Sequence, residues 1–183
     1  MADTALLIID IQNDYFPGGK MELERAAAAA ARARQALDKF RALGRPLFHV
    51  QHLSTRPGAT FFVPGTEGAE IYDLVKPAGG EPVVQKNFPN SFRATDLQAR
   101  LEKAGIKNLA VAGMMTHMCV DASVRQAFDL GFGCTVLSDA CATRAQNFEG
   151  QDIAAAQVHG AFLAALRGVY AQVMPTEDYL KTL

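Results

Sequence analysis

The stretch Leu6–Asp10 (LLIID) decides the fold class, because four large aliphatic residues lead directly into a carboxylate. A continuous apolar run of this kind, without polar alternation, is typical of a strand buried on both faces of a parallel sheet. An ionised carboxylate at the end of such a strand loses its water at a high free-energy cost unless a partner meets it. Asp10 therefore raises the question of which later residue is its partner.

Length and composition limit the classes of protein to consider. The 183 residues carry a net charge of -1, with 49% hydrophobic and 20% charged residues, so we expect a single domain over residues 1–183. No basic run or global charge favours nucleic acid or a membrane surface. Three cysteines without a CxxC motif argue against a disulfide framework, and no secretory signal precedes LLIID; both features predict a cytoplasmic protein.

Strand-like and helix-like segments alternate along the chain. Six segments read as strands: Ala5–Asp10, Pro46–Gln51, Pro82–Lys86, Asn108–Gly113, Cys134–Ser138 and Val169–Met174. Helices are predicted between them, at Leu23–Leu43, from Thr95 to about Gly105, at Cys119–Leu130 and Asp152–Leu166, with a short one at Glu177–Thr182. This alternation predicts an α/β fold, a three-layer α/β/α sandwich around a six-stranded parallel sheet.

Parallel strands place their carboxyl ends, and the ligands they bind, on one rim of the sheet. Asp10 ends the first predicted strand, Lys86 ends the third, and the loop 113–119 follows the fourth. We therefore expect Lys86 to be the partner of Asp10, with Cys119 beside them.

Cys119 lies where a tight turn leads from a buried strand into an amphipathic helix. Backbone N–H groups at a helix N-terminus stabilise anions, and a neighbouring lysine acts in the same direction, so we expect the pKa of this thiol to be lowered. Asp10 can accept the thiol proton. The three residues thus supply a nucleophile, a base and a cation.

Three motifs in this order resemble those of the isochorismatase-like cysteine hydrolases: DIQNDYF from Asp10, VVQKNFPNSF from Val83 and GMMTHMCVDASVRQAFDLGF from Gly113. That superfamily includes nicotinamidases, N-carbamoylsarcosine amidases and ureidoacrylate hydrolases. The resemblance covers nearly the whole chain and implies a Rossmann-like hydrolase fold with Asp10, Lys86 and Cys119 as catalytic triad. It also implies a cis peptide between Met114 and Met115, an oxyanion hole from the backbone N–H groups of Met115 and Cys119, and a homodimer or larger homo-oligomer.

The sequence departs from the nicotinamidase pattern after the second strand. Nicotinamidases carry an Asp-x-His pair for a divalent metal there, whereas this chain has Gln51, His52 and Leu53. A metal needs several fixed ligands, so we predict no metal and no cofactor. Strict isochorismatases, which cleave a vinyl ether, often lack the cysteine. Its presence favours C–N amide or related acyl bonds of a small molecule.

Other residues near the predicted rim are weaker candidates. Aromatic residues in the rim loops suggest an apolar pocket wall; the predicted substrate pocket comprises Gln12, Phe16, Phe62, Phe88 and His117. Asp14 is expected to pair with a basic group. Cys141 is the one rival nucleophile, while Cys134 reads as a core residue. The Gly/Pro-rich stretch 52–80 carries enough apolar residues that we expect it to cover the rim or to contact a second subunit.

The sequence thus predicts a metal-independent cysteine hydrolase that works through a thioester. Two alternatives remain at this point. A vinyl-ether hydrolase would work through Asp10 and tolerate loss of Cys119. A non-catalytic scaffold could have kept the pocket without the reaction, although it would have no reason to hold the three residues together.

Overall fold

The apolar run before Asp10 forms the strand β1 (Thr4–Ile9) inside the sheet of the computed structural model, which describes residues 3–183. β1 pairs in parallel with β2 (Leu47–His52) and with β4 (Asn108–Met114). Residues 5–9 are at most 2% exposed, so both faces of this strand are covered. The LLIID stretch is the doubly buried strand that its sequence predicts.

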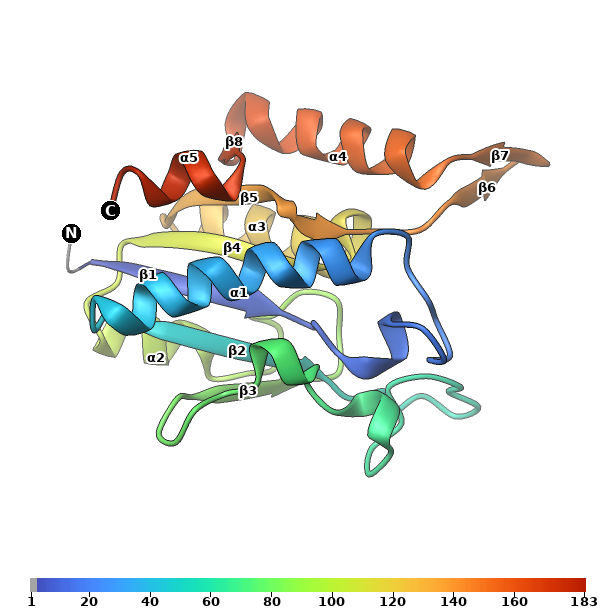
Figure 1. The fold of residues 1–183 in the computed structure, drawn as a ribbon, viewed down its shortest axis with the longest axis horizontal. Coiled ribbons are helices and arrows are strands. Elements are labelled where there is room, and N and C mark those ends of the chain that lie inside the picture. Colours follow the sequence, from blue (N-terminus) through green and yellow to red (C-terminus); the bar gives the residue numbers. More distant parts are fainter. Residues whose placement is uncertain (1–2) are drawn as a thin grey trace.

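The sheet has six parallel strands in the order β3-β2-β1-β4-β5-β8. The three strands not yet placed are β3 (Val83–Lys86), β5 (Gly133–Ala142) and β8 (Gln172–Met174). β2 and β3 therefore lie on one side of β1 and the later strands on the other (Figure 1). The predicted three-layer α/β/α class is confirmed, with the six strands near their predicted positions.

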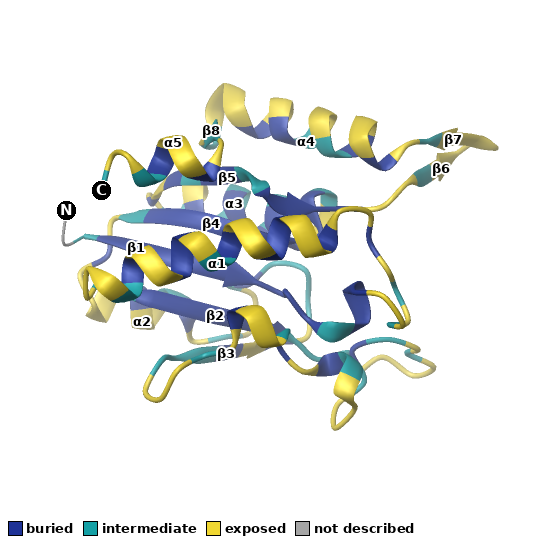
Figure 2. Ribbon diagram, viewed as in Figure 1, coloured by how far each residue is buried: buried dark blue, intermediate teal, exposed yellow. Residues whose placement is uncertain are grey.

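Helices cover both faces of this sheet. α1 (Ala26–Ala42) and α5 (Thr176–Leu180) lie over one face, in front in Figure 1. The opposite face packs against α2 (Leu97–Lys103), α3 (Asp121–Asp129) and α4 (Ala155–Val169). Alternate residues of β1 point into the two hydrophobic cores on either side of the sheet, and the central strands β1, β2 and β4 are largely dark blue, that is buried, in Figure 2. The alanines of α1 that face the sheet are at most 3% exposed, because small side chains let this helix lie close to the strands.

Some element bounds differ from the sequence-based prediction. The predicted helix 152–166 starts later, because an antiparallel hairpin of β6 (Gln146–Phe148) and β7 (Gln151–Ile153) precedes α4 and projects from the body (Figure 1). This hairpin has no buried face, so it shows no apolar alternation that sequence reasoning could detect. β5 also runs four residues past its predicted end, Ser138, to Ala142.

The stretch after β2 folds back over the rim of the sheet. It contains the short helical turns η2 (Glu67–Ala69) and η3 (Asp73–Val75), with a third turn, η1 (Asn13–Tyr15), beneath it. Phe62, Ile71 and Val75 are buried, and the Tyr72 N–H donates to the Ile11 carbonyl over 2.9 Å. These apolar residues cover the rim of their own chain. No helix of the described residues is long and apolar enough to span a membrane.

One carboxylate ties three elements together at the opposite end of the sheet. Glu81 accepts two hydrogen bonds from Arg41 of α1, at 2.7 and 2.8 Å, and lies 3.0 Å from Nε2 of the buried His49 in β2. The Arg41 hydrogen bonds hold the pKa of Glu81 at about 2, although its partial burial acts in the opposite direction. Glu81 therefore joins α1, β2 and the start of β3.

We predict that Glu81→Gln lowers the free energy of unfolding by about 1–3 kcal/mol at pH 7, since charge-assisted hydrogen bonds are lost. Because the pKa of Glu81 is lowered from 4.5 to about 2 in the folded state, this contribution is complete above pH 4.5 and disappears as the pH falls toward 2. Urea denaturation at pH 7 and near pH 3 measures it. Glu67→Gln, at an exposed carboxylate without a side-chain partner among residues 3–183, is the control. Equal stability of the two variants at pH 7 would contradict the assignment.

Candidate active site

Asp10 leaves β1 in an unusual backbone conformation. Its φ is 50°, in the left-handed region that aspartate tolerates better than most residues, and its N–H donates to the Val50 carbonyl over 3.0 Å. The residue is fully buried, and Oδ1 accepts no hydrogen bond from residues 3–183. This leaves a carboxylate oxygen free to accept a proton from a neighbour.

Lys86 ends β3, two strands away from β1, and its ammonium reaches the same point. Nζ lies 2.6 Å from Asp10 Oδ2 and 3.3 Å from Cys119 Sγ. It also lies 3.0 Å from Nδ1 of His52 and 3.1 Å from the carbonyl oxygen of Phe88. A lysine with no exposed side-chain surface is thus surrounded by acceptors, and it is the partner that Asp10 requires.

Cys119 is brought to this pair by the turn that follows β4. The chain passes from β4 through a cis peptide between Met114 and Met115 into a π-helical turn, η4 (Thr116–Val120). Gly113 has φ 151° and lies against the carbonyl of Ile9, where a Cβ atom would overlap it. Only glycine lets β4 approach β1 this closely, next to Asp10.

Two residues of η4 are held by side chains from outside the turn. Thr116 Oγ1 lies 2.9 Å from Nδ1 of His159 in α4 and donates to the Ala142 carbonyl. His117 Nδ1 lies 2.5 Å from Thr143 Oγ1. These contacts fix the turn that carries Cys119, and no sequence motif signals them.

The electrostatics of the site differ from the expectation for the thiol. Burial raises the pKa of Cys119, the Asp10 carboxylate raises it further, and Lys86 only partly offsets both. The prediction of a lowered pKa is wrong because the side chain is 5% exposed and faces a carboxylate as well as an ammonium. Burial alone would lower the pKa of Lys86, but the charge of the Asp10 carboxylate raises it, so the lysine stays charged. The resting site therefore holds a neutral thiol beside the Asp10 carboxylate.

His52 is the side chain at this centre whose role the sequence did not reveal. Burial and the nearby Lys86 charge lower the pKa of His52 to about 4, so the ring is neutral near pH 7. Its Nδ1 can then accept a hydrogen bond from Lys86. Asp10, His52 and Cys119 place one potential metal-ligand atom each within 4.8 Å of one another. The Lys86 ammonium, however, contacts all three and already supplies a positive charge at their centre. These residues do not fit a divalent metal.

A cavity of about 320 Å³ opens onto the Cys119 thiol. Its wall is formed by aromatic, polar and other side chains, among them Tyr15, His52, Arg56, Phe61, Phe62, Asn87 and Met115. The rings of Tyr15 and Phe62 meet edge to face with centroids 4.7 Å apart. Sequence reasoning missed Tyr15; its place directly before Phe16 in the first motif was the one available signal. The cavity is of the size that holds a small molecule.

Several pocket predictions need correction. Gln12 is fully buried below the cavity and bonds to both the N–H and the carbonyl of His52. Phe16 stacks on Tyr72 in the core, with ring centroids 3.6 Å apart, and His117 braces η4. Phe88 contributes its carbonyl to Lys86 while its ring lies 3.9 Å from the Arg93 guanidinium. Of the five predicted pocket residues, Phe62 lines the cavity.

Asp14 also differs from its prediction. It is buried, and its carboxylate accepts backbone N–H groups, from Lys20 over 3.1 Å and from Phe62 over 2.6 Å. It pairs with no basic side chain among residues 3–183. Asp14 therefore fixes two loops rather than balancing a charge.

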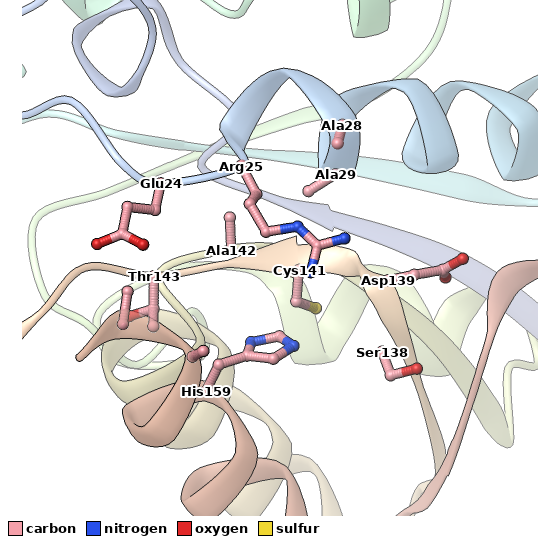
Figure 3. Close-up of a pocket in the computed structure, with 12 residues that line it drawn as sticks. Glu24, Arg25, Ala28, Ala29, Ser138, Asp139, Cys141, Ala142, Thr143 and His159 are labelled. Carbon is pink, nitrogen blue, oxygen red and sulfur yellow. The ribbon is translucent and has the colours of Figure 1, made fainter. Parts of the chain in front are cut away.

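A second cavity, of about 340 Å³, lies between the start of α1, β5 and α4 (Figure 3). Cys141 lines it together with Arg25, Asp139 and His159, and none of the Asp10, Lys86 and Cys119 side chains does. Burial raises the pKa of Cys141 to about 12, and no lysine among residues 3–183 forms a hydrogen bond with its sulfur. Cys141 therefore lies apart from Asp10 and Lys86, in a cavity that it shares with Arg25 and Asp139.

A thiol held between an ammonium and a carboxylate at the base of a cavity is suited to attack on a carbonyl, which places this protein among the cysteine hydrolases. The family model described as Isochorismatase domain matches residues 4–178. The chain is 52% identical to the uncharacterized isochorismatase family protein YddQ of Bacillus subtilis (strain 168), over 97% of this chain and 99% of that protein. The chain belongs to the isochorismatase family.

Two further relatives extend this result. The crystal structure of a putative isochorismatase hydrolase from Oleispira antarctica superposes with a TM-score of 0.95 at 48% identity, covering 98% of this chain and 97% of that one. The ureidoacrylate amidohydrolase RutB of Stutzerimonas stutzeri (strain A1501) is 27% identical over 76% of this chain and 69% of its own length. The family resemblance seen in the three motifs is confirmed.

We predict that dialysis against a strong chelator leaves hydrolytic activity unchanged, because Lys86 occupies the position that a cation would take. Activity before and after chelation, together with the metal content of the purified protein, measures this. His52→Gln is a matched variant, since it removes one potential metal ligand; it should not confer sensitivity to the chelator. Loss of activity on chelation that added zinc or manganese restores would contradict the prediction.

Proposed function

We propose that the protein hydrolyses a C–N amide, or a related acyl bond, of a small molecule through a thioester on Cys119. The observation that carries the proposal is the buried contact of Lys86 with both Asp10 and Cys119 beneath a cavity open to the thiol. The amidohydrolase activity in the name of the RutB relative supports the choice of a C–N bond.

The first half of the reaction forms the thioester. As Cys119 Sγ attacks the substrate carbonyl, its proton passes to Asp10, which carries no other proton donor on Oδ1. The carbonyl oxygen gains negative charge and is stabilised by the backbone N–H groups of Met115 and Cys119, which both line the cavity. When the C–N bond breaks, the leaving nitrogen takes the proton from Asp10.

The second half reverses these roles. Water loses a proton to Asp10 as it attacks the thioester, and the proton returns to the sulfur when the acid product leaves. Lys86 keeps the charge of the site balanced at each stage: its ammonium neutralises Asp10 at rest and the sulfur as its proton departs. A raised resting pKa of Cys119 suits this scheme, because proton transfer and attack are coupled rather than separate steps.

Vinyl-ether hydrolysis explains this site less well. That reaction would use Asp10, and the Lys86–Cys119 contact of 3.3 Å would have no role in it. A scaffold without activity would likewise gain nothing from burying an ion pair beside a thiol, since a hydrophobic replacement is often as stable.

We predict that Asp10→Asn lowers turnover by about 10²–10⁴-fold while the protein stays folded, because asparagine keeps the shape but accepts no proton. Initial rates on primary amides and ureido acids, with circular dichroism as the folding check, measure it. A folded Asp10→Asn protein with most of its turnover would remove Asp10 from the mechanism.

We also predict that Cys119→Ser abolishes turnover, whereas Cys141→Ser, the matched change at another buried cysteine, retains it. Iodoacetamide should alkylate Cys119 faster than Cys134 and Cys141, because Asp10 can take the Cys119 proton as the sulfur reacts, and the Lys86 ammonium, 3.3 Å from that sulfur, stabilises the charge that develops there. Mass spectrometry of tryptic peptides measures the three rates. Equal rates, or an active Cys119→Ser protein, would refute a covalent mechanism.

A further inference from the structure

Arg56 lies on a loop whose backbone is fixed over the cavity. Its carbonyl accepts the Ala59 N–H over 3.1 Å across Pro57 and Gly58, and Gly58 has φ 75°. Proline followed by a glycine with positive φ is the pattern of a type II turn, which is stiff for its length. The Arg56 side chain is therefore presented from a rigid position.

The base of this loop is anchored as well. The Ser54 N–H donates to the Phe62 carbonyl over 2.8 Å and closes the loop, and the Phe62 N–H donates to the buried Asp14 over 2.6 Å. Asp14 therefore holds the Arg56 loop in place from below. The loop belongs to the ordered wall of the cavity.

The cavity wall carries a positive charge, and no negative side chain of the described residues in the wall balances it. Within the described part of the chain, the cavity lining includes Arg56 but no aspartate or glutamate, and His52 is neutral near pH 7. Arg56 forms no ion pair and no side-chain hydrogen bond with residues 3–183, unlike Arg34, Arg41 and Arg125 on the outer surface. Beneath the cavity, Lys86 and Asp10 neutralise each other. A guanidinium without a carboxylate thus borders a cavity that otherwise carries no net charge.

We propose that Arg56 binds an anionic group of the substrate, of the carboxylate class, while the carbonyl to be cleaved lies at Cys119. The planar guanidinium offers paired N–H donors that match a carboxylate in geometry as well as in charge. A cavity of about 320 Å³ limits the substrate to a small molecule with both groups. The proposal rests on the proposed function and adds to it the substrate class: amides or ureido compounds that also carry a carboxylate.

An exposed arginine is by default a solvated surface charge. Two features distinguish Arg56 from that default: its turn is rigid, and it shares one cavity with the Cys119 thiol. The effect of its charge already extends to the site, because Arg56 helps to lower the pKa of His52, after burial and Lys86. A negative group near Arg56 would therefore be attracted toward the reacting atoms.

Two alkylating reagents test this without knowledge of the substrate. Iodoacetate and iodoacetamide deliver the same carbon to Cys119 and differ in the negative charge. We expect Arg56→Gln to lower the iodoacetate-to-iodoacetamide rate ratio at Cys119 by about fivefold at low salt, the effect of one unit charge at close range in water. Added salt should reduce this difference.

Arg167→Gln in α4, which removes the same charge from an exposed position outside the cavity lining, is the control and should keep the ratio of the unaltered protein. Thermal melting shows that the variants are folded. An equal ratio for the unaltered protein and Arg56→Gln would overturn the proposal.

The outcomes also separate this proposal from the proposed function. If Cys119 is alkylated selectively but Arg56→Gln does not change the iodoacetate-to-iodoacetamide rate ratio, the cysteine mechanism stands and the anion site is refuted. If Cys119 is no more reactive than Cys134 and Cys141, the proposed function fails.

Succinamate and its methyl ester provide the matching turnover test: Arg56→Gln should raise KM for succinamate and leave KM for the ester unchanged.

Discussion

The buried ion pair between Asp10 and Lys86 is the interaction on which the site depends. Taking both charges out of water costs several kcal/mol per ion, and only close contact with full hydrogen bonding offsets that cost. The 2.6 Å contact, together with the acceptors from His52, Phe88 and Cys119, meets this requirement for the lysine. The pair therefore constrains three strands and the turn after β4 to meet at one point.

The parallel sheet makes this meeting possible. Asp10 follows β1 and Lys86 ends β3, so the two side chains meet past the carboxyl end of β2, which lies between these strands. Gly113 lets β4 lie directly against β1, and the turn η4 then delivers Cys119 to the same rim. A substitution at Gly113 would push β4 away from β1 and so move the turn that carries Cys119 away from Asp10.

Burial away from water sets the protonation state of the Cys119 thiol. A fully exposed cysteine at a helix N-terminus would have a lowered pKa, but burial and the Asp10 charge dominate here and keep the proton on sulfur. The same burial keeps Asp10 close to the thiol, as the proposed proton transfer requires. The wall formed by the loop from Ser54 to Phe62 excludes water on one side and, through Arg56, brings a positive charge to the cavity.

The sequence by itself determined the fold class and the three residues at the centre. LLIID requires a doubly buried strand and a charged partner, and the alternation of strands and helices identifies the rim where Lys86 and Cys119 also lie. These local patterns determine the arrangement, because a parallel sheet buries its central strands on both faces and places the carboxyl ends of all its strands on one rim.

The tertiary structure decided the rest. The pKa of Cys119, the neutral state of His52 and the role of Asp14 depend on burial and on neighbours distant in sequence. Tyr15 lines the cavity while Phe16 packs in the core, although the two are adjacent in the chain and both aromatic. No sequence pattern reports which way such a side chain turns. The bend after β1 and the loop folded over it determine which side chain faces the cavity. Contacts that exist only in the folded chain fix both the bend and the loop.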